Sequence, residues 1–198
     1  MKIQSLRGMP DLFPEDLDRW HIFESKLSKI FHSFGTREIR TPLLESTELF
    51  SRSVGNSSDI VNKEIYSFND RNDKGIALRP EGTASIIRSI VEKKLDQSNH
   101  KLWYLGPMWR YERPQKGRYR QFNQAGIEIL GIPEGMPEFE MISIVCAIIT
   151  EFNLENCTIK INHLGNQKSK ESFCNALIDF LEPHKKLLDE KDNQRLEK

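Results

Sequence analysis

The 198-residue sequence predicts an α+β fold, in which a mainly antiparallel sheet is flanked by helices. Segments with strand character occur in pairs that short polar turns separate. Segments with apolar residues at three- and four-residue steps lie between these pairs. Hydrophobic residues make up 37% of the chain, which is enough to form a core. Hairpin strands separated by helices are typical of α+β domains.

The first predicted element is an amphipathic helix that begins at Pro14 and stops before Gly35. Proline favours the first helical turn, and glycine commonly follows the last one. An extended segment follows at residues 36–46, and Pro42 interrupts it because proline cannot donate to a sheet ladder. The apolar face of the helix consists of Leu17, Trp20, Phe23, Leu27, Ile30, Phe31 and Phe34.

A β-hairpin is predicted next. It joins residues 63–68 to residues 75–80 through the polar tip at residues 69–74. After Thr83 the apolar spacing again predicts a helix, which runs through Leu95.

A second hairpin joins residues 101–113 to residues 118–131, and the intervening PQKG supplies a turn. A mostly buried helix over residues 137–152 follows. Residues 157–165 are expected to form a final strand. From Asn166 onward the sequence becomes polar and helical.

Charge and composition exclude several classes of protein. The 29 basic residues balance the 29 acidic ones, so a polyanion would have to bind a local patch. No apolar run approaches the roughly 18 residues of a membrane span, and the first residues lack the apolar stretch of a secretory signal. Cys146, Cys157 and Cys174 do not have metal-ligand spacing. We expect them to be buried, reduced thiols in a cytoplasmic protein.

One hairpin concentrates positive charge in this otherwise balanced chain. Alternation along its first strand places Arg110 and Glu112 on one face. If the returning strand pairs with it, Phe122, Gln124 and Glu128 share that face. The segment GPMWRYERPQKGRYRQF contains one acid and five cations, which are Arg110, Arg113, Lys116, Arg118 and Arg120.

These side chains suit a compact ligand with phosphate, purine and cationic ends. A guanidinium fork matches a phosphate, an aromatic ring can stack on a purine, and carboxylates can bind an ammonium group. ATP together with an amino acid forms such a ligand set. The pattern alone leaves two other interpretations open: a solvated edge that basic residues protect from aggregation, and an RNA-binding strip of basic and aromatic residues.

The segment ALRPEGTA indicates a second binding edge. A strand ends there, and a helix begins shortly afterwards. Gly82 allows the backbone to approach a ligand closely, while Glu81 and Thr83 could offer a carboxylate and a hydroxyl group. The alternative is helix capping, with Thr83 as the cap and Glu81 as a solvated turn residue.

Three stretches together resemble the catalytic core of the histidyl-tRNA synthetases, which are class II aminoacyl-tRNA synthetases. They are RGMPDLFP near the start, LRPEGTA, and GPMWRYERPQKGRYRQFNQAGIEILG. The likeness runs from Leu6 to Gly131 and continues more weakly through INHLGN. It implies that residues 1–165 form the N-terminal part of the catalytic core and that residues 166–198 begin the family's helical insertion. It also implies a homodimer through residues 15–50.

The resemblance implies roles for individual residues. The catalytic residue Arg110 would contact the α-phosphate of ATP and the carboxylate of histidine. Glu112 would lie near the adenine amino group, Arg118 near the γ-phosphate, and Phe122 would stack on adenine. Glu128 would face the imidazole ring. Mg²⁺ would arrive with ATP, without a metal site made by the protein. The histidine-binding set would be Glu81, Gly82, Thr83, Arg110, Gln124 and Glu128.

The implied activity is that of a histidine–tRNA ligase. Histidine and ATP would give histidyl-adenylate and pyrophosphate, and histidine would then be transferred to tRNA(His). Complete synthetases add a further catalytic arginine, a third motif and an anticodon-binding domain, none of which is found in these residues. We therefore expect an N-terminal fragment that is inactive alone. The alternatives are an RNA-binding module and the histidine-binding regulatory subunit of ATP phosphoribosyltransferase, against which Glu81 and KGRYRQF argue.

Overall fold

The chain forms two compact units, residues 1–155 and residues 156–198. The computed structural model describes residues 3–54, 64–113, 115–133, 135–162, 165–189, 192–193 and 196. The second unit contains α5 (Gln167–Leu181) and the 3-10 helix η2 (Glu182–Leu187). Its assignment to a helical insertion of the family stays a prediction. None of the described helices is long and apolar enough to cross a membrane.

Helix α1 (Pro14–Ser33) has the predicted bounds. Pro14 occupies its first turn together with Glu15 and Asp16, whose negative charges favour the positive end of the helix dipole. Gly35 follows with a φ of 71°, a left-handed conformation that glycine adopts without strain. The apolar face of α1 buries Leu27 and Phe31 against the rest of the unit.

Sheet A consists of three strands in the order β1-β5-β6. The long strands β5 (His100–Trp109) and β6 (Gln121–Leu130) are antiparallel neighbours, as the second predicted hairpin requires. The short strand β1 (Arg37–Glu38) pairs with β5 in the parallel direction. The architecture is therefore mainly, but not wholly, antiparallel.

Sheet B is separate from sheet A and has the order β2-β4-β3. Its strands β2 (Leu44–Ser46), β4 (Gly75–Leu78) and β3 (Tyr66–Asn69) are all antiparallel. Pro42 lies between β1 and β2, where the extended segment passes from one sheet to the other. Helix α2 (Thr47–Val54) packs on sheet B through Phe50, which is fully buried with Ala77 and Ala84.

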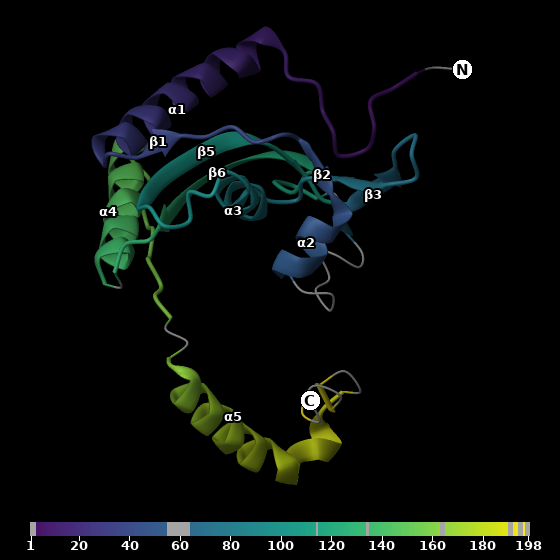
Figure 1. The fold of residues 1–198 in the computed structure, drawn as a ribbon, viewed down its shortest axis with the longest axis vertical. Coiled ribbons are helices and arrows are strands. Elements are labelled where there is room, and N and C mark those ends of the chain that lie inside the picture. Colours follow the sequence, from purple (N-terminus) through teal and green to yellow (C-terminus); the bar gives the residue numbers. More distant parts are fainter. Residues whose placement is uncertain are drawn as a thin grey trace. The chain divides into compact units, whose positions relative to one another are not determined.

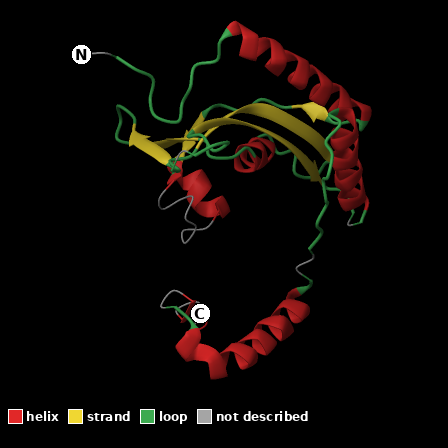
Figure 2. Cartoon of the chain, turned by 180° about the vertical axis from the view of Figure 1, so that it is seen from behind, coloured by secondary structure: helices red, strands yellow, loops and turns green. Residues whose placement is uncertain are grey.

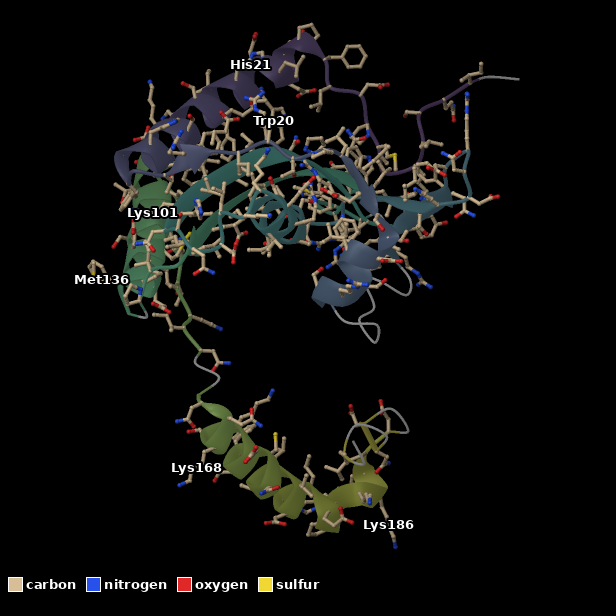
Figure 3. All side chains as sticks on the ribbon, viewed as in Figure 1. Trp20, His21, Lys101, Met136, Lys168 and Lys186 are labelled. Atoms are coloured by element: carbon tan, nitrogen blue, oxygen red, sulfur yellow. The ribbon has the colours of Figure 1, made fainter. Side chains whose placement is uncertain are left out.

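Sheet A carries a hydrophobic core on each face, with α1 and α3 on opposite sides of it (Figure 1). Helix α4 (Met136–Glu151) lies beside the end of α1, which is also visible from behind in Figure 2. Lys101 on β5 lies beside α4, where its ammonium group pairs with Glu140 (Figure 3). The α1/α4 core contains Leu27, Phe31, Trp103 and Ile144. The core under α3 (Thr83–Glu92) contains Ile86, Ile90, Tyr104 and Met108.

Both strands of the second hairpin are shorter than predicted. β5 ends at Trp109 rather than at residue 113, because the Glu112 amide donates to the Arg110 carbonyl at 2.8 Å and so tightens the backbone into a turn. β6 begins at Gln121 instead of Arg118. Side chains therefore alternate between the two faces of the sheet up to residue 110, and this alternation ends beyond it.

The strand predicted over residues 157–165 is wrong. Residues 157–162 form no strand and are exposed, while residues 163–164 lie outside the described residues. A strand is held by hydrogen bonds to a neighbouring strand. No such neighbour pairs with residues 157–162 in the described part of the chain, so the apolar alternation produces no strand here.

Two expectations of burial are also wrong. Only one side of α4 packs on the sheet, through Ile144, whereas Phe139 and Val145 are 73% and 41% exposed. A helix in an outer layer buries only the stripe that faces the core. The three cysteines are exposed rather than buried.

Candidate functional site

The candidate site lies on the face of sheet A that α3 covers. The register pairs Phe122 with Met108, Gln124 with Gly106, and Glu128 with Leu102. Met108 and Phe122 belong to the core under α3, so the alternating residues of β6 point to that same face. Phe122, Gln124 and Glu128 therefore share one face, as alternation predicts.

Arg110 stands at the end of β5, next to Phe122. Its backbone amide still donates to the Arg120 carbonyl at 2.9 Å, which continues the hairpin by one residue. Its Nε donates to the Pro80 carbonyl at 2.9 Å. Its guanidinium carbon lies 5.2 Å from the centroid of the Phe122 ring, a distance typical of cation–π contact. Among the described residues, neither of its Nη groups has a hydrogen-bond acceptor.

Glu81 caps helix α3. Its two carboxylate oxygens accept hydrogen bonds from the backbone amides of Thr83 at 2.5 Å and Ala84 at 2.9 Å. These amides belong to the first turn of α3, where backbone donors have no partner within the helix. Helix capping, the alternative interpretation of this segment, does occur here. The capping side chain is that of Glu81, not that of Thr83.

Thr83 links α3 to β6. Its hydroxyl group donates to Glu128 Oε1 at 2.7 Å, across 45 positions of sequence. The ALRPEGTA segment and the second hairpin are therefore parts of one site. In the part of the chain described by the structure, neither Glu81 nor Glu128 forms an ion pair with lysine or arginine.

The half-buried position of Glu128 raises the pKa of its carboxyl group, mainly through the loss of solvation. The hydrogen bond from Thr83 lowers that pKa, and the nearby charge of Glu81 raises it further. Two carboxylates without a cationic partner form an environment that favours a bound cation. An ammonium or imidazolium group fits this requirement.

A family model described as Histidyl-tRNA synthetase matches residues 8–198. The chain belongs to the histidyl-tRNA synthetase family. Among curated relatives, the Histidine–tRNA ligase of Prochlorococcus marinus (strain MIT 9211) is 46% identical over 198 residues, which are 100% of this chain and 47% of that protein. That of Limosilactobacillus fermentum is 43% identical over 202 residues, covering 100% of this chain and 47% of that protein. The chain spans about half the length of the curated relatives it matches.

Solved structures show the same fold. Apo histidyl-tRNA synthetase of S. aureus aligns with a TM-score of 0.79 and 35% identity, over 98% of this chain and 46% of that chain. A Bacillus halodurans protein described as an ATP phosphoribosyltransferase regulatory subunit/histidyl-tRNA synthetase aligns with a TM-score of 0.73 and 22% identity, over 99% of this chain and 55% of that chain. At this identity the second likeness concerns the fold alone. The predicted α+β fold of the class II synthetase type is confirmed.

In this member of the histidyl-tRNA synthetase family, the hairpin tip holds a pair of opposite charges. Arg118 Nε lies 2.7 Å from Glu112 Oε2, and the side chains are 59% and 13% exposed, respectively. Gly117 turns the chain with a φ of 79°, while Pro114 lies outside the described residues. The contact is an ion pair rather than a directed hydrogen bond, because Glu112 Oε2 has no well-aligned donor in the described structure. Glu112 and Arg118 are thus paired with each other at the tip.

The N-terminal stretch RGMPDLFP supports the base of this hairpin. The Gly8 carbonyl accepts hydrogen bonds from the backbone amides of Arg120 at 2.8 Å and Gln121 at 3.1 Å. The Arg120 guanidinium stacks 3.8 Å above the centroid of the Tyr111 ring. RGMPDLFP and LRPEGTA therefore both contact the hairpin, which is the third stretch of the family resemblance. Gly8 makes the first contact and Pro80 the second.

Sequence reasoning missed one residue in the middle of the candidate site, Tyr104. Gln124 Nε2 donates to the Tyr104 hydroxyl oxygen at 3.1 Å. A side chain on Gly82 would overlap the Tyr104 ring, so the glycine makes room for this ring. Its predicted close approach to a ligand stays a prediction. Residues of the two strands can be paired by counting back from the hairpin turn. This count pairs Tyr104 with Gly126, so it could have placed Tyr104 among the site residues of β6.

Proposed function

We propose that this chain supplies the ATP- and histidine-binding surfaces of a histidine–tRNA ligase. The ligase would convert histidine and ATP to histidyl-adenylate and pyrophosphate, and would then transfer histidine to tRNA(His). The observation that carries the proposal is the shared face of sheet A. There the cation Arg110 contacts the aromatic ring of Phe122, and Thr83 joins Glu128 across the same face.

Arg110 is the proposed catalytic residue. A carboxylate oxygen of histidine forms a bond to the α-phosphorus of ATP, and the bond from that phosphorus to the pyrophosphate oxygen breaks. Negative charge grows on the non-bridging oxygens, so a preorganised guanidinium stabilises the transition state more than the ground state. The hydrogen bond from Arg110 Nε to the Pro80 carbonyl fixes the orientation of the guanidinium before the ligands bind. No protein base is required, because the carboxylate of histidine is already ionised at neutral pH.

Histidine is proposed to bind beside the N-terminus of α3. Glu81, Thr83 and Gln124 would hold its ammonium group, and Glu128 would accept a hydrogen bond from its imidazole ring. Gln124 Oε1 is buried and accepts no hydrogen bond from the described residues, which leaves an acceptor for the ligand. A buried carboxylate such as Glu128 also penalises amino acids that lack a donor at this position.

ATP is proposed to bind along the hairpin. Phe122 would stack on adenine, Glu112 would face its amino group, and Arg118 would approach the γ-phosphate. Because Glu112 and Arg118 pair with each other here, nucleotide binding would exchange that ion pair for contacts to ATP. Mg²⁺ would come with ATP through phosphate oxygens. In the described residues, no three His, Cys, Asp or Glu side chains are grouped as a metal site.

We further propose that the protein is a cytoplasmic homodimer that associates through residues 15–50. Apolar side chains in this region are exposed in the described chain, which supports a covered surface in a dimer. Ile22 is 61% exposed, and Leu43 is 44% exposed.

Calorimetry with ATP, histidine and both together tests the proposed function. We expect Arg110→Ala and Arg118→Ala to weaken ATP binding by about tenfold or more, because each substitution removes a charge-assisted contact to phosphate. Arg71→Ala, which changes an exposed arginine at the β3–β4 loop, is the matched control and should bind ATP like the unchanged chain.

The same titrations separate the proposal from its alternatives. ATP binding that is unaffected in both Arg110→Ala and Arg118→Ala would contradict the proposed ATP site. Histidine binding without any response to ATP would favour a regulatory subunit. RNA binding that weakens steeply with salt and ignores both small molecules would favour an RNA-binding module.

A further inference from the structure

Tyr104 occupies a slot between two glycines on the face of sheet A that carries the candidate site. The residue is 6% exposed and lies in the middle of β5. A Cβ atom added at Gly126 would lie 2.5 Å from the Tyr104 hydroxyl oxygen, and one added at Gly82 would overlap the other side of the ring. Neither position can carry a side chain while the ring stays in place. The ring is therefore held between β6 and the start of α3.

The Tyr104 hydroxyl group contacts a side chain of β6 that belongs to the candidate site. It accepts a hydrogen bond from Gln124 Nε2 at 3.1 Å. On the α3 side the ring lies against Gly82, the residue before Thr83. The hydroxyl group of Thr83 donates to Glu128 Oε1 at 2.7 Å.

We propose that Tyr104 is a positioning residue that orients Gln124 toward the ammonium group of histidine. Since Gln124 Nε2 is held by Tyr104, its Oε1 is turned away as a buried acceptor without a partner in the described structure. This inference rests on the proposed function, because histidine is the ligand whose ammonium group it positions.

The substitution Tyr104→Phe isolates the role of the hydroxyl group. The phenyl ring still fills the slot between Gly82 and Gly126, so the packing of the core is kept. Gln124 loses the acceptor that fixes its amide. Tyr119→Phe is the matched control, because Tyr119 is 48% exposed and lies at the hairpin tip.

The test compares L-histidine with 3-(imidazol-4-yl)propionate, which has the ring and the carboxylate but no ammonium group. Calorimetry is done on the full chain, with and without ATP. We expect Tyr104→Phe to weaken L-histidine binding by about three- to tenfold, the effect of one lost hydrogen bond. Binding of the propionate and of ATP should change less than about twofold, and Tyr119→Phe should leave all three unchanged.

A merely structural role of Tyr104 would weaken both imidazole ligands equally, and that result would overturn the inference. Unchanged histidine binding in Tyr104→Phe would overturn it as well, while the proposed function would stand. If the unchanged chain binds neither histidine nor ATP, the proposed function fails and this inference fails with it.

A ligand-free measurement keeps the inference testable even if Tyr104→Phe loses stability. In ¹H–¹⁵N NMR spectra, the side-chain amide protons of Gln124 should exchange slowly with solvent in the unchanged chain. The Gln124→Met variant identifies these signals by removing them. Rapid solvent exchange of the Gln124 amide protons in the unchanged chain would show that Tyr104 does not hold this side chain.

Discussion

Glu128 is a carboxylate whose environment opposes its charge. Burial raises its pKa and Glu81 adds to the effect, while only the hydroxyl group of Thr83 acts in the other direction. The residue nevertheless lies where a cationic ligand is proposed to bind. The folded protein therefore holds a group that is more costly to ionise here than in the unfolded chain, and the bound ligand would offset this cost.

The stability of the ligand-free chain should depend on pH through Glu128. A carboxyl group with a raised pKa binds more protons in the folded than in the unfolded state, between the unfolded and the folded pKa. The free energy of unfolding therefore falls as pH rises through this window, and the contribution present below the unfolded pKa is lost above the folded one. Glu128→Gln should lack this fall. Urea titrations at pH values from about 4 to 8 measure how the free energy of unfolding changes with pH in the unchanged chain and in the variant.

The expected signature is a stability difference, variant minus unchanged chain, that increases with pH. Asp18→Asn, which removes one exposed acid on α1, is the control for the loss of a single negative charge. A difference that is constant with pH, or that decreases, would show that the Glu128 environment is not as described.

Among the elements, Arg79 joins the two sheets. It follows β4 of sheet B, is 6% exposed, and its Nε donates to the Pro107 carbonyl of β5 at 3.1 Å. Its Nη1 donates to both oxygens of Thr41, at 3.1 and 3.0 Å, in the segment between β1 and β2. Burial lowers the pKa of this guanidinium, but arginine stays charged in proteins. Arg79 thus sets where the LRPEGTA segment meets sheet A.

Replacing Arg79 with methionine should destabilise the chain by about 2–4 kcal/mol, since it leaves part-buried carbonyl groups without this donor. Arg71→Met, at an exposed loop position, should change stability by less than about 0.5 kcal/mol. Urea-induced unfolding followed by circular dichroism measures both values. Equal stability of the two variants would contradict the proposed joint between the sheets.

Sequence patterns located most elements because their periodicity is local. The three- and four-residue spacing predicted α1, and alternation placed Phe122, Gln124 and Glu128 on one face of β6. The patterns could not show that Pro42 lies between two separate sheets, because strand partners are distant in sequence. The expected strand at residues 157–165 fails for the same reason: its apolar alternation was visible, but the absence of a pairing strand in the described residues was not.

Only the part of the candidate site that lies on the second hairpin could be predicted from the sequence. Motif resemblance and alternation alone predict that Arg110, Phe122 and Glu128 share one site. The capping bonds of Glu81 and the central place of Tyr104 depend on how α3 packs against sheet A. That packing is a tertiary contact, and no local pattern encodes it.

On the scale of the whole molecule, the proposed dimer predicts an effect of surface charge. Introducing an acid at an exposed apolar position of residues 15–50, as in Leu43→Asp, should weaken self-association because it places a charge in an apolar contact. Phe173→Asp, at a position that is 66% exposed in the second unit, is the control. Sedimentation equilibrium measures the monomer–dimer constant of each. An unchanged chain that stays monomeric at all concentrations would contradict the proposal.

A crystal structure of the chain with L-histidine and a non-hydrolysable ATP analogue would show where both ligands bind. We expect both ligands on the α3 face of sheet A, with the α-phosphate at Arg110, adenine on Phe122, and the imidazole ring at Glu128. Ligand density on the α1/α4 face, or ordered ligands that contact none of these three side chains, would contradict it.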